Sequence, residues 1–113
     1  MDWVLVMAGG ATGAALRYGA GLWLARPGFP WATLFVNLLG GLVMGLLMAR
    51  APSEPLRLLL GVGVLGGFTT FSAFGLDTWR LLSGGQTVLA LVYVAVSVVG
   101  AVALTGFGLV LAR

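Results

Sequence analysis

Four long apolar stretches account for nearly the whole chain, and they cover residues 3–25, 31–49, 56–82 and 88–112. Each reaches the ~20 residues that a helix needs to cross ~30 Å of hydrocarbon. Short hinges that contain polar residues or proline separate the stretches. The pattern predicts an all-α integral membrane protein, built as a single four-helix membrane domain over residues 1–113.

The composition supports a membrane location. The chain has 113 residues, of which 60% are hydrophobic and only 8% charged. A soluble domain of this size would have too little polar surface to face water. The first stretch is not expected to be a cleaved signal peptide, because the start Met1-Asp2-Trp3 has no positive n-region and the apolar run is too long.

Few residues could carry out acid–base or metal chemistry. The chain has no cysteine and no histidine, so a disulfide framework and a thiolate metal site are excluded. The three acids are Asp2, Glu54 and Asp77, and none lies deep in a predicted span. General acid–base catalysis needs titratable groups that converge on one pocket. We therefore predict that the chain is not an enzyme.

The positive charges are six arginines, which stand singly near the ends of the stretches. Because they do not cluster on one face, nucleic acid is not an expected partner. Arg50, Arg57 and Arg113 fall on the side of the two termini, and Arg26 and Arg80 fall on the other, toward which Arg17 leans. Orientation normally follows a clear excess of such charges. The near balance leaves two alternatives: a small one-sided bias, or dual topology with an antiparallel dimer.

The third apolar stretch is interrupted at residues 66–75, which read GGFTTFSAFG. Unsatisfied backbone groups cost several kcal/mol each in hydrocarbon, so irregular backbone survives there only when it lines a cavity or binds something. We predict a helix break at residues 66–70 and expect the functional site of the protein to lie there. Carbonyls freed by the break and supplied by two chains would suit a cation such as Na⁺. Alternatively, Ser and Thr side chains and water satisfy those carbonyls locally.

Two polar residues of the first half lie at membrane depth. Arg17 is either an interfacial anchor that snorkels or a permanent positive charge at the mouth of a water-filled vestibule. Asn37 lies four residues after Thr33, on the same helical face. Asn37 is either an interhelical hydrogen-bonding residue or an uncharged donor for an anion.

The fourth stretch carries Tyr93, Ser97, Ala101 and Thr105 at intervals of four residues, so these positions form one stripe. The stripe is either an uncharged polar track or a set of interfacial and back-bonded hydroxyls. In the third stretch, phenylalanines recur every three residues at positions 68, 71 and 74. They serve packing and lipid contact, or they direct positive ring edges toward an anion.

Glycine pairs with GxxxG spacing occur at residues 9–13, 41–45 and 63–67, among 19 glycines in all. This spacing lets helix backbones approach closely. Packing within one chain and packing between two chains explain the pairs equally well.

Three segments, read in order, resemble the Fluc (CrcB) family of fluoride channels: residues 9–18, 33–40 and 66–74. The third segment is the most specific. The resemblance implies a dual-topology, antiparallel homodimer in a prokaryotic plasma or inner membrane, surrounded by membrane lipids. It implies passive, fluoride-selective export through two pores, which lowers cytoplasmic fluoride. Pairing with a non-identical homologue remains a variant of this reading.

The resemblance also implies roles for particular residues. A structural, non-transported Na⁺ would be held by the backbone carbonyls of Gly66 and Thr69, and Arg17 would lie near the vestibule. The implied pore residues are Thr33, Asn37, Thr70, Phe71, Ser72, Phe74, Tyr93 and Ser97. Ala73 and Ala101 depart from the family pattern, which has hydroxyl residues there more often.

Two other functions were weighed. A small multidrug exporter has a similar length and four spans, but proton-coupled exchange wants a carboxylate within the first span, and none follows Asp2 there. A membrane subunit without transport activity, assembled with a partner, is the second alternative.

Overall fold

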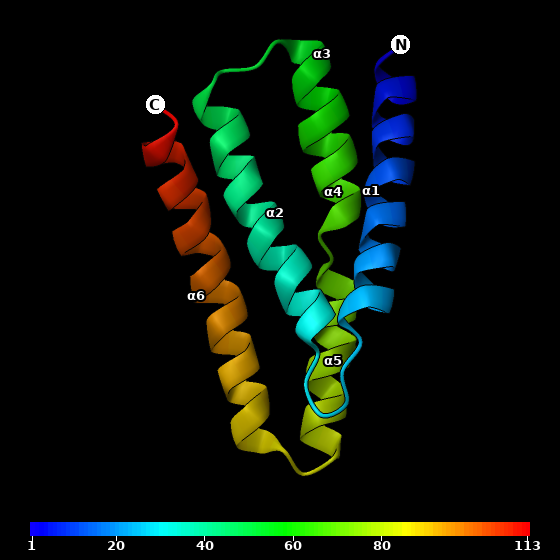
Figure 1. The fold of residues 1–113 in the computed structure, drawn as a ribbon, viewed down its shortest axis with the longest axis vertical. Helices are drawn as coiled ribbons and strands as arrows, with labels where there is room; N and C mark the ends of the chain where they lie inside the picture. Colours follow the sequence, from blue (N-terminus) through cyan, green and yellow to red (C-terminus); the bar gives the residue numbers. More distant parts are fainter.

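The computed structural model describes all 113 residues, and every element in it is helical. The elements are α1 (Asp2–Leu24), α2 (Trp31–Ala49), α3 (Glu54–Leu56), the π-helical segment η1 (Arg57–Leu65), α4 (Gly66–Phe68), α5 (Phe71–Ser83) and α6 (Thr87–Leu111). Because α3, η1 and α4 follow one another without a gap, they form one rod, and α5 continues it after an interruption (Figure 1). The four helical spans begin and end within two residues of the apolar stretches in the sequence.

Three spans are long and apolar enough to cross a membrane: Trp31–Ala49, Glu54–Ser83 and Thr87–Leu111. The helix α1 is 23 residues long but less apolar, since it carries Arg17 and several glycines. The all-helical fold class is confirmed, and a fourth membrane crossing by α1 stays a prediction.

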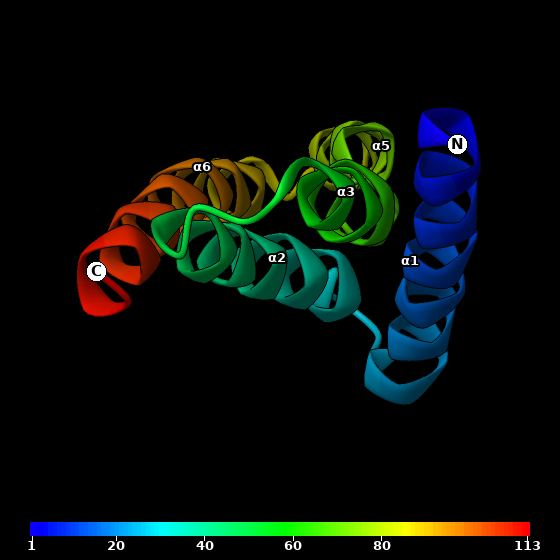
Figure 2. The ribbon, with the colours of Figure 1, turned by 90° about the horizontal axis from the view of Figure 1, so that it is seen from above.

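The helices pair two by two. The helix α1 packs against the rod formed by η1 and α4 and crosses it at an angle, whereas α2 lies along α6 (Figures 1 and 2). The turn between α5 and α6 is short, since Gly84 and Gly85 donate to the carbonyls of Arg80 and Leu82. Gly85 has a φ of +80°, which glycine adopts without strain. This turn makes α5 and α6 antiparallel neighbours.

The first seam between helices is made of backbone. A Cβ atom on Gly63 would lie 2.8 Å from the Gly9 Cα, and one on Gly9 would lie 2.9 Å from the Val64 nitrogen. A Cβ on Gly13 would collide with the Val64 carbonyl. Only glycine fits at such separations. The pairs at 9–13 and 63–67 therefore pack against each other within one chain.

The second seam, between α2 and α6, is built in the same way. A Cβ atom on Gly108 would lie 2.8 Å from the Leu46 nitrogen, and one on Gly41 would lie 3.0 Å from the Ala101 oxygen. One on Gly45 would collide with the Thr105 carbonyl. All three GxxxG pairs thus serve contacts within the chain, which decides between the two alternatives for them.

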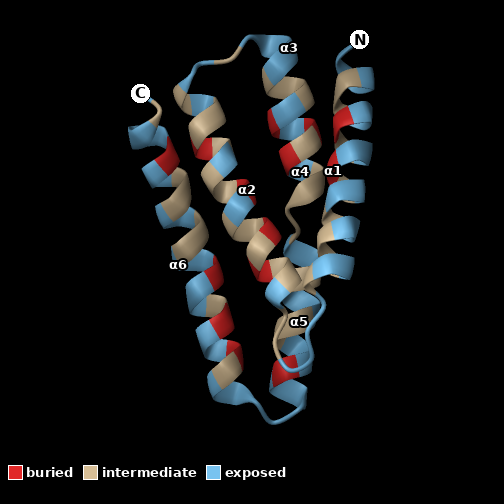
Figure 3. Cartoon of the chain, in the orientation of Figure 1, coloured by how far each residue is buried: buried red, intermediate tan, exposed pale blue.

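The buried core is small. Only 14 of 113 residues are buried, so most large apolar side chains face outward (Figure 3). Water-soluble monomers rarely expose apolar surface on this scale. The main buried cluster joins Leu34, Leu81, Ala90 and Tyr93. This surface suits a lipid environment or a partner chain rather than water.

Candidate functional site

The third span is interrupted at two residues. Thr69 (φ −84°, ψ 157°) and Thr70 (φ −150°, ψ 126°) are extended. The last helical bond runs from the Thr69 N–H to the Leu65 carbonyl at 3.0 Å. The prediction of a break beginning at Gly66 is wrong for residues 66–68, which are helical in α4. The reason is that Gly67 is needed for close approach to α1 rather than for flexibility, since a Cβ there would lie 3.1 Å from the Ala14 nitrogen.

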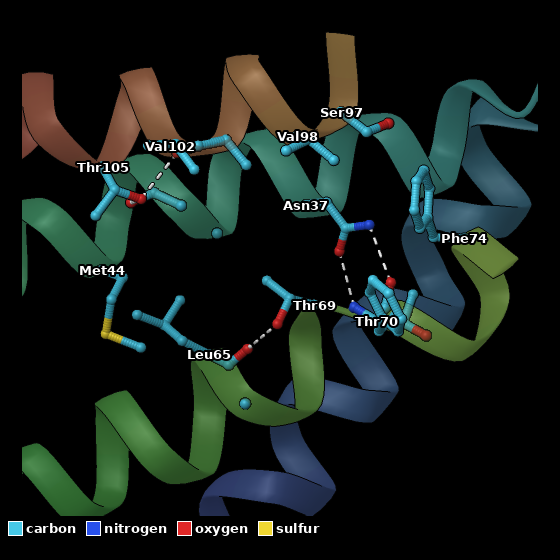
Figure 4. A pocket seen from close by; sticks show the side chains of 15 residues that line it. Asn37, Met44, Leu65, Thr69, Thr70, Phe74, Ser97, Val98, Val102 and Thr105 are labelled. Carbon is cyan, nitrogen blue, oxygen red and sulfur yellow. Dashed lines mark hydrogen bonds between the residues drawn. The ribbon is translucent and has the colours of Figure 1, made fainter. Parts of the chain in front are cut away.

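Asn37 holds the break from α2. Its Nδ2 donates to the Thr70 carbonyl at 3.0 Å, and its Oδ1 accepts from the Thr70 N–H at 2.8 Å (Figure 4). One side-chain amide thus satisfies both backbone groups of an extended residue. This geometry favours the hydrogen-bonding role that the sequence left open for Asn37, and it does not exclude a further N–H for a ligand, because the amide nitrogen carries two.

The hydroxyls of the break also bond locally. The Thr69 Oγ1 donates to the Leu65 carbonyl at 3.0 Å, and the Thr70 Oγ1 accepts from the Ala73 N–H at 3.1 Å. Thr70 is therefore the N-cap of α5, the position at which threonine is favoured. The Ser72 hydroxyl lies 3.3 Å from that of Thr70. These bonds explain why a helix can restart here after two extended residues.

A pocket of about 420 Å³ opens beside the break, between α2, α6 and the two parts of the third span (Figure 4). It brings together seven of the predicted pore and cation-site residues: Asn37, Gly66, Thr69, Thr70, Phe71, Phe74 and Ser97. Its other lining residues include Met44, Val98, Val102 and Thr105, and none is charged. The pocket thus combines apolar walls with hydroxyl, amide and backbone polar groups.

Ser97 lines this pocket, and its hydroxyl is buried. The residue is 6% exposed, and its Oγ has no hydrogen-bond partner. Buried polar atoms are nearly always paired, so this hydroxyl is a donor that the chain itself does not use. Ser97 and Phe74 lie at the same end of the pocket (Figure 4).

The four residues of the stripe on α6 do not share one role. Ser97, Ala101 and Thr105 line the pocket, but Thr105 uses its Oγ1 on the Gly41 and Ala101 carbonyls, both at 2.9 Å. Tyr93 is fully buried outside the pocket, and its hydroxyl lies 3.2 Å from the Asp77 Oδ2, to which it donates. A continuous track along all four positions is therefore not present in the single chain.

Asp77, which the sequence offers only as one of three acids outside the depth of the spans, has a partner in the structure. It lies one turn after Phe74 on α5 and accepts the hydrogen bond from Tyr93. The available signal was the spacing of three residues from Phe74, which puts the carboxylate on the same helical face. Asp77 and Arg80 also line a hollow of about 270 Å³ at the hinges.

The phenylalanines differ in exposure. The Phe71 ring is 82% exposed, whereas Phe74 is half-buried. Their centroids lie 5.6 Å apart, and Phe74 lies 5.2 Å from Tyr93. Both rings line the larger pocket, and only Phe74 is also anchored in the core cluster.

A second pocket of about 270 Å³ lies between α1, α2 and α5, and it contains Arg17, Thr33, Thr70 and Ala73. The structure thus places Thr33 apart from Asn37, although both are on α2. The Nε of Arg17 donates to the Gly67 carbonyl at 3.1 Å. Thr70 is the one residue that lines both pockets.

The two pockets suit an anion better than catalysis. No group of three or more acidic, histidine or cysteine side chains is placed to bind a metal. The second pocket supplies a permanent positive charge, and the first supplies uncharged donors.

Comparison with known proteins identifies relatives along nearly the whole chain. The family described as CrcB-like protein, Camphor Resistance (CrcB), matches residues 4–109. A protein of Sphingopyxis alaskensis named fluoride-specific ion channel FluC is 53% identical over 96% of this chain and 92% of its own. Proteins of the same name are 48% identical in Hyphomonas neptunium, over 97% of this chain and 94% of theirs, and 51% identical in Thermus thermophilus, over 80% and 77%.

Proposed function

The chain belongs to the CrcB family, and on that premise we propose that it is a fluoride-selective ion channel. It is a multi-pass membrane protein that lets fluoride leave the cell passively and so lowers the cytoplasmic concentration. The observation that carries the proposal is the 53% identity, over 96% of the chain, to a protein named as such a channel. The expectation that the chain is not an enzyme agrees with a family of ion channels.

The two pockets support a division of labour along the ion path. A guanidinium keeps its charge at any physiological pH, so Arg17 in the second pocket attracts anions at a vestibule. Past Thr70, the lining is uncharged, and the free hydroxyl of Ser97 donates to a small anion. The edges of Phe71 and Phe74 carry partial positive charge and favour the anion without holding it tightly. Thr33 and Ser72 would extend the donors at the two ends, and Tyr93, whose hydroxyl is bound to Asp77, would support the path through its contact with Phe74.

A second copy of the chain would complete the path. The larger pocket is open on one side, and the exposed ring of Phe71 stands at its rim. An antiparallel homodimer would cover this opening with an identical face, and the near balance of arginines supports insertion in both orientations. Pairing with a non-identical homologue would serve the same purpose.

The break also offers a donor set that fits Na⁺. The Thr70 N–H, which a continuous helix would direct to the Gly66 carbonyl, bonds to Asn37 instead, and Thr69 is extended. Gly66 and Thr69 both line the larger pocket. Their carbonyls are hard, uncharged oxygens of the kind that bind alkali cations. A bound Na⁺ would supply positive charge that joins two chains at their breaks.

Replacing Na⁺ with a bulky organic cation tests the cation site. We expect the dimer in detergent to dissociate more readily, because carbonyls from two chains would then face each other without a shared cation. Size-exclusion chromatography with light scattering measures this. A dimer that is equally stable in both buffers would contradict the site.

Fluoride efflux from liposomes tests the channel itself. The purified chain is reconstituted in vesicles loaded with fluoride or chloride, and a selective electrode follows release after the membrane potential is clamped. We expect fluoride to leave rapidly and chloride to stay. Vesicles that retain fluoride as well as protein-free ones would refute the function.

A further inference from the structure

The Gly67 carbonyl is the backbone group that the break releases toward α1. In a helix that continued past Phe68, this carbonyl would accept from the N–H of Phe71. Because Thr69 and Thr70 are extended and Phe71 begins α5, that bond is lost. The carbonyl accepts from the Nε of Arg17 at 3.1 Å instead. Within hydrocarbon, the same carbonyl without a donor would be costly.

The first glycine seam brings Arg17 to this position. Gly13, one turn before Arg17 on α1, is so close to the rod that a Cβ there would lie 2.8 Å from the Phe68 nitrogen. A Cβ on Gly67 would lie 3.1 Å from the Ala14 nitrogen. Residues four apart share a helical face. Arg17 is therefore the next side chain along that face, just past the end of α4.

Arg17 can serve two functions because it bonds to the break through Nε and not through its terminal nitrogens. Arginine has one N–H on Nε and the others on its two terminal nitrogens. The bond to Gly67 uses Nε alone. The terminal nitrogens, which carry the remaining donors, stay available to the second pocket that Arg17 lines.

We propose that Arg17 is a positioning residue for the helix break. Its Nε–H holds the end of α4 from the side of α1, as Asn37 holds Thr70 from the side of α2. The break is thus held at Gly67, just before the two extended residues, and at Thr70, the second of them. The inference rests on the proposed function only where it says that the break shapes the fluoride path.

Substitutions at Arg17 separate the bond from the charge. Gln places its Nε2 donor at the same distance along the side chain as the arginine Nε, but it has no charge. Lys keeps the charge but puts a methylene at that position, and Met keeps neither the donor nor the charge. Arg26→Gln is the matched control, because it removes an exposed arginine near the same end of α1.

Backbone hydrogen–deuterium exchange of the full-length protein in detergent reports on the break directly. We expect Arg17→Gln to keep the exchange of residues 66–75 near that of the wild type. Arg17→Lys and Arg17→Met should raise it about tenfold, as expected for losing a hydrogen bond to a charged donor. Exchange in α6 should stay unchanged in all variants, which shows that the rest of the chain is folded.

Fluoride efflux and its selectivity over chloride are measured on the same variants in liposomes. Selectivity over chloride should follow the bond to Gly67, so we expect Arg17→Gln to keep it better than Arg17→Lys, whereas the rate of efflux should fall in Arg17→Gln because the charge at the vestibule is lost. Protection or selectivity retained by Lys and lost by Gln would overturn the proposal, as would equal behaviour of the two variants in exchange. If the wild type itself conducts no fluoride, the proposed function fails, while the order of exchange rates still decides whether Arg17 holds the break.

Discussion

The glycine seams and the helix break are stabilised in opposite ways. In the seams, backbone touches backbone, and a Cβ on Gly9, Gly13 or Gly45 would collide with a neighbouring helix. At the break, the backbone has no helical partner, and side chains of Asn37 and Arg17 supply the missing bonds. The seams therefore fix where the helices lie, and the break creates polar backbone at depth. Substitutions in the first should remove the fold, and substitutions in the second should remove the function.

The largest effect is expected from Gly13→Ala. The new Cβ meets the backbone of Val64, which cannot move aside, so we expect the free energy of unfolding to fall by about 3 kcal/mol or more. Gly19→Ala is the control on the same helix, because nothing lies within 4 Å of a Cβ there. The control should be neutral or stabilising by about 1 kcal/mol through helix propensity. Thermal unfolding in detergent compares them, and equal stability would contradict the seam.

Asn37→Leu should also lower stability, and it should abolish conduction. It leaves the Thr70 N–H and carbonyl without partners, at about 1–3 kcal/mol each. We expect a folded protein whose fluoride efflux is lost. Asn37→Asp keeps the acceptor for the Thr70 N–H but sets a carboxylate oxygen against the Thr70 carbonyl, and its negative charge should block the anion path as completely as leucine does. Rapid efflux through either variant would argue against a role of this residue.

Substitutions of Phe71 and Phe74 should affect stability differently but lower fluoride efflux alike. Phe71→Ile alters a ring that is 82% exposed, so its stability should change by less than about 0.5 kcal/mol. Phe74→Ile disturbs the contact with Tyr93 and should destabilise the chain by about 1–3 kcal/mol. Both should lower fluoride efflux. Unchanged efflux in both variants would remove the rings from the path.

The smallest structural effect is expected from Ser97→Ala. The hydroxyl has no partner, and an unsatisfied buried group costs about 1–3 kcal/mol, so its removal should leave stability unchanged or slightly higher. Efflux should nevertheless fall severalfold, because a donor is lost from the pocket. Thr105→Ala is the comparison, since that hydroxyl is used inside the second seam and its loss should lower stability instead. Equal effects of the two on efflux would contradict the special place of Ser97.

The helices could be predicted from the sequence because an apolar run long enough to cross a membrane is compatible with few structures other than a helix. Sequence reasoning located the break near residues 66–70 from composition, but not its start, because Gly66 and Gly67 are compatible with helix and with distortion alike. The sequence could not show which helix each GxxxG pair contacts, since the spacing indicates a close approach but does not identify the partner helix.

At the candidate site, the residue types predicted the chemistry of the lining better than they predicted where each residue lies. Asn37, Phe71, Phe74 and Ser97, which the family resemblance assigns to the pore, line one pocket, and their pore role stays a prediction. Thr33 and Asn37 share a helical face, yet they line different pockets, because the break places Thr70 between them. The Asp77–Tyr93 bond joins residues 16 apart, and only the turn between α5 and α6 reveals it.

Thr70 separates the two pockets, and its backbone is tied on both its donor and its acceptor side by Asn37. Because Asn37 fixes its backbone in this way, Thr70 cannot act as a moving gate between the pockets. Ions that cross it are sorted by the groups they meet on either side, so discrimination would be continuous and would need no moving part.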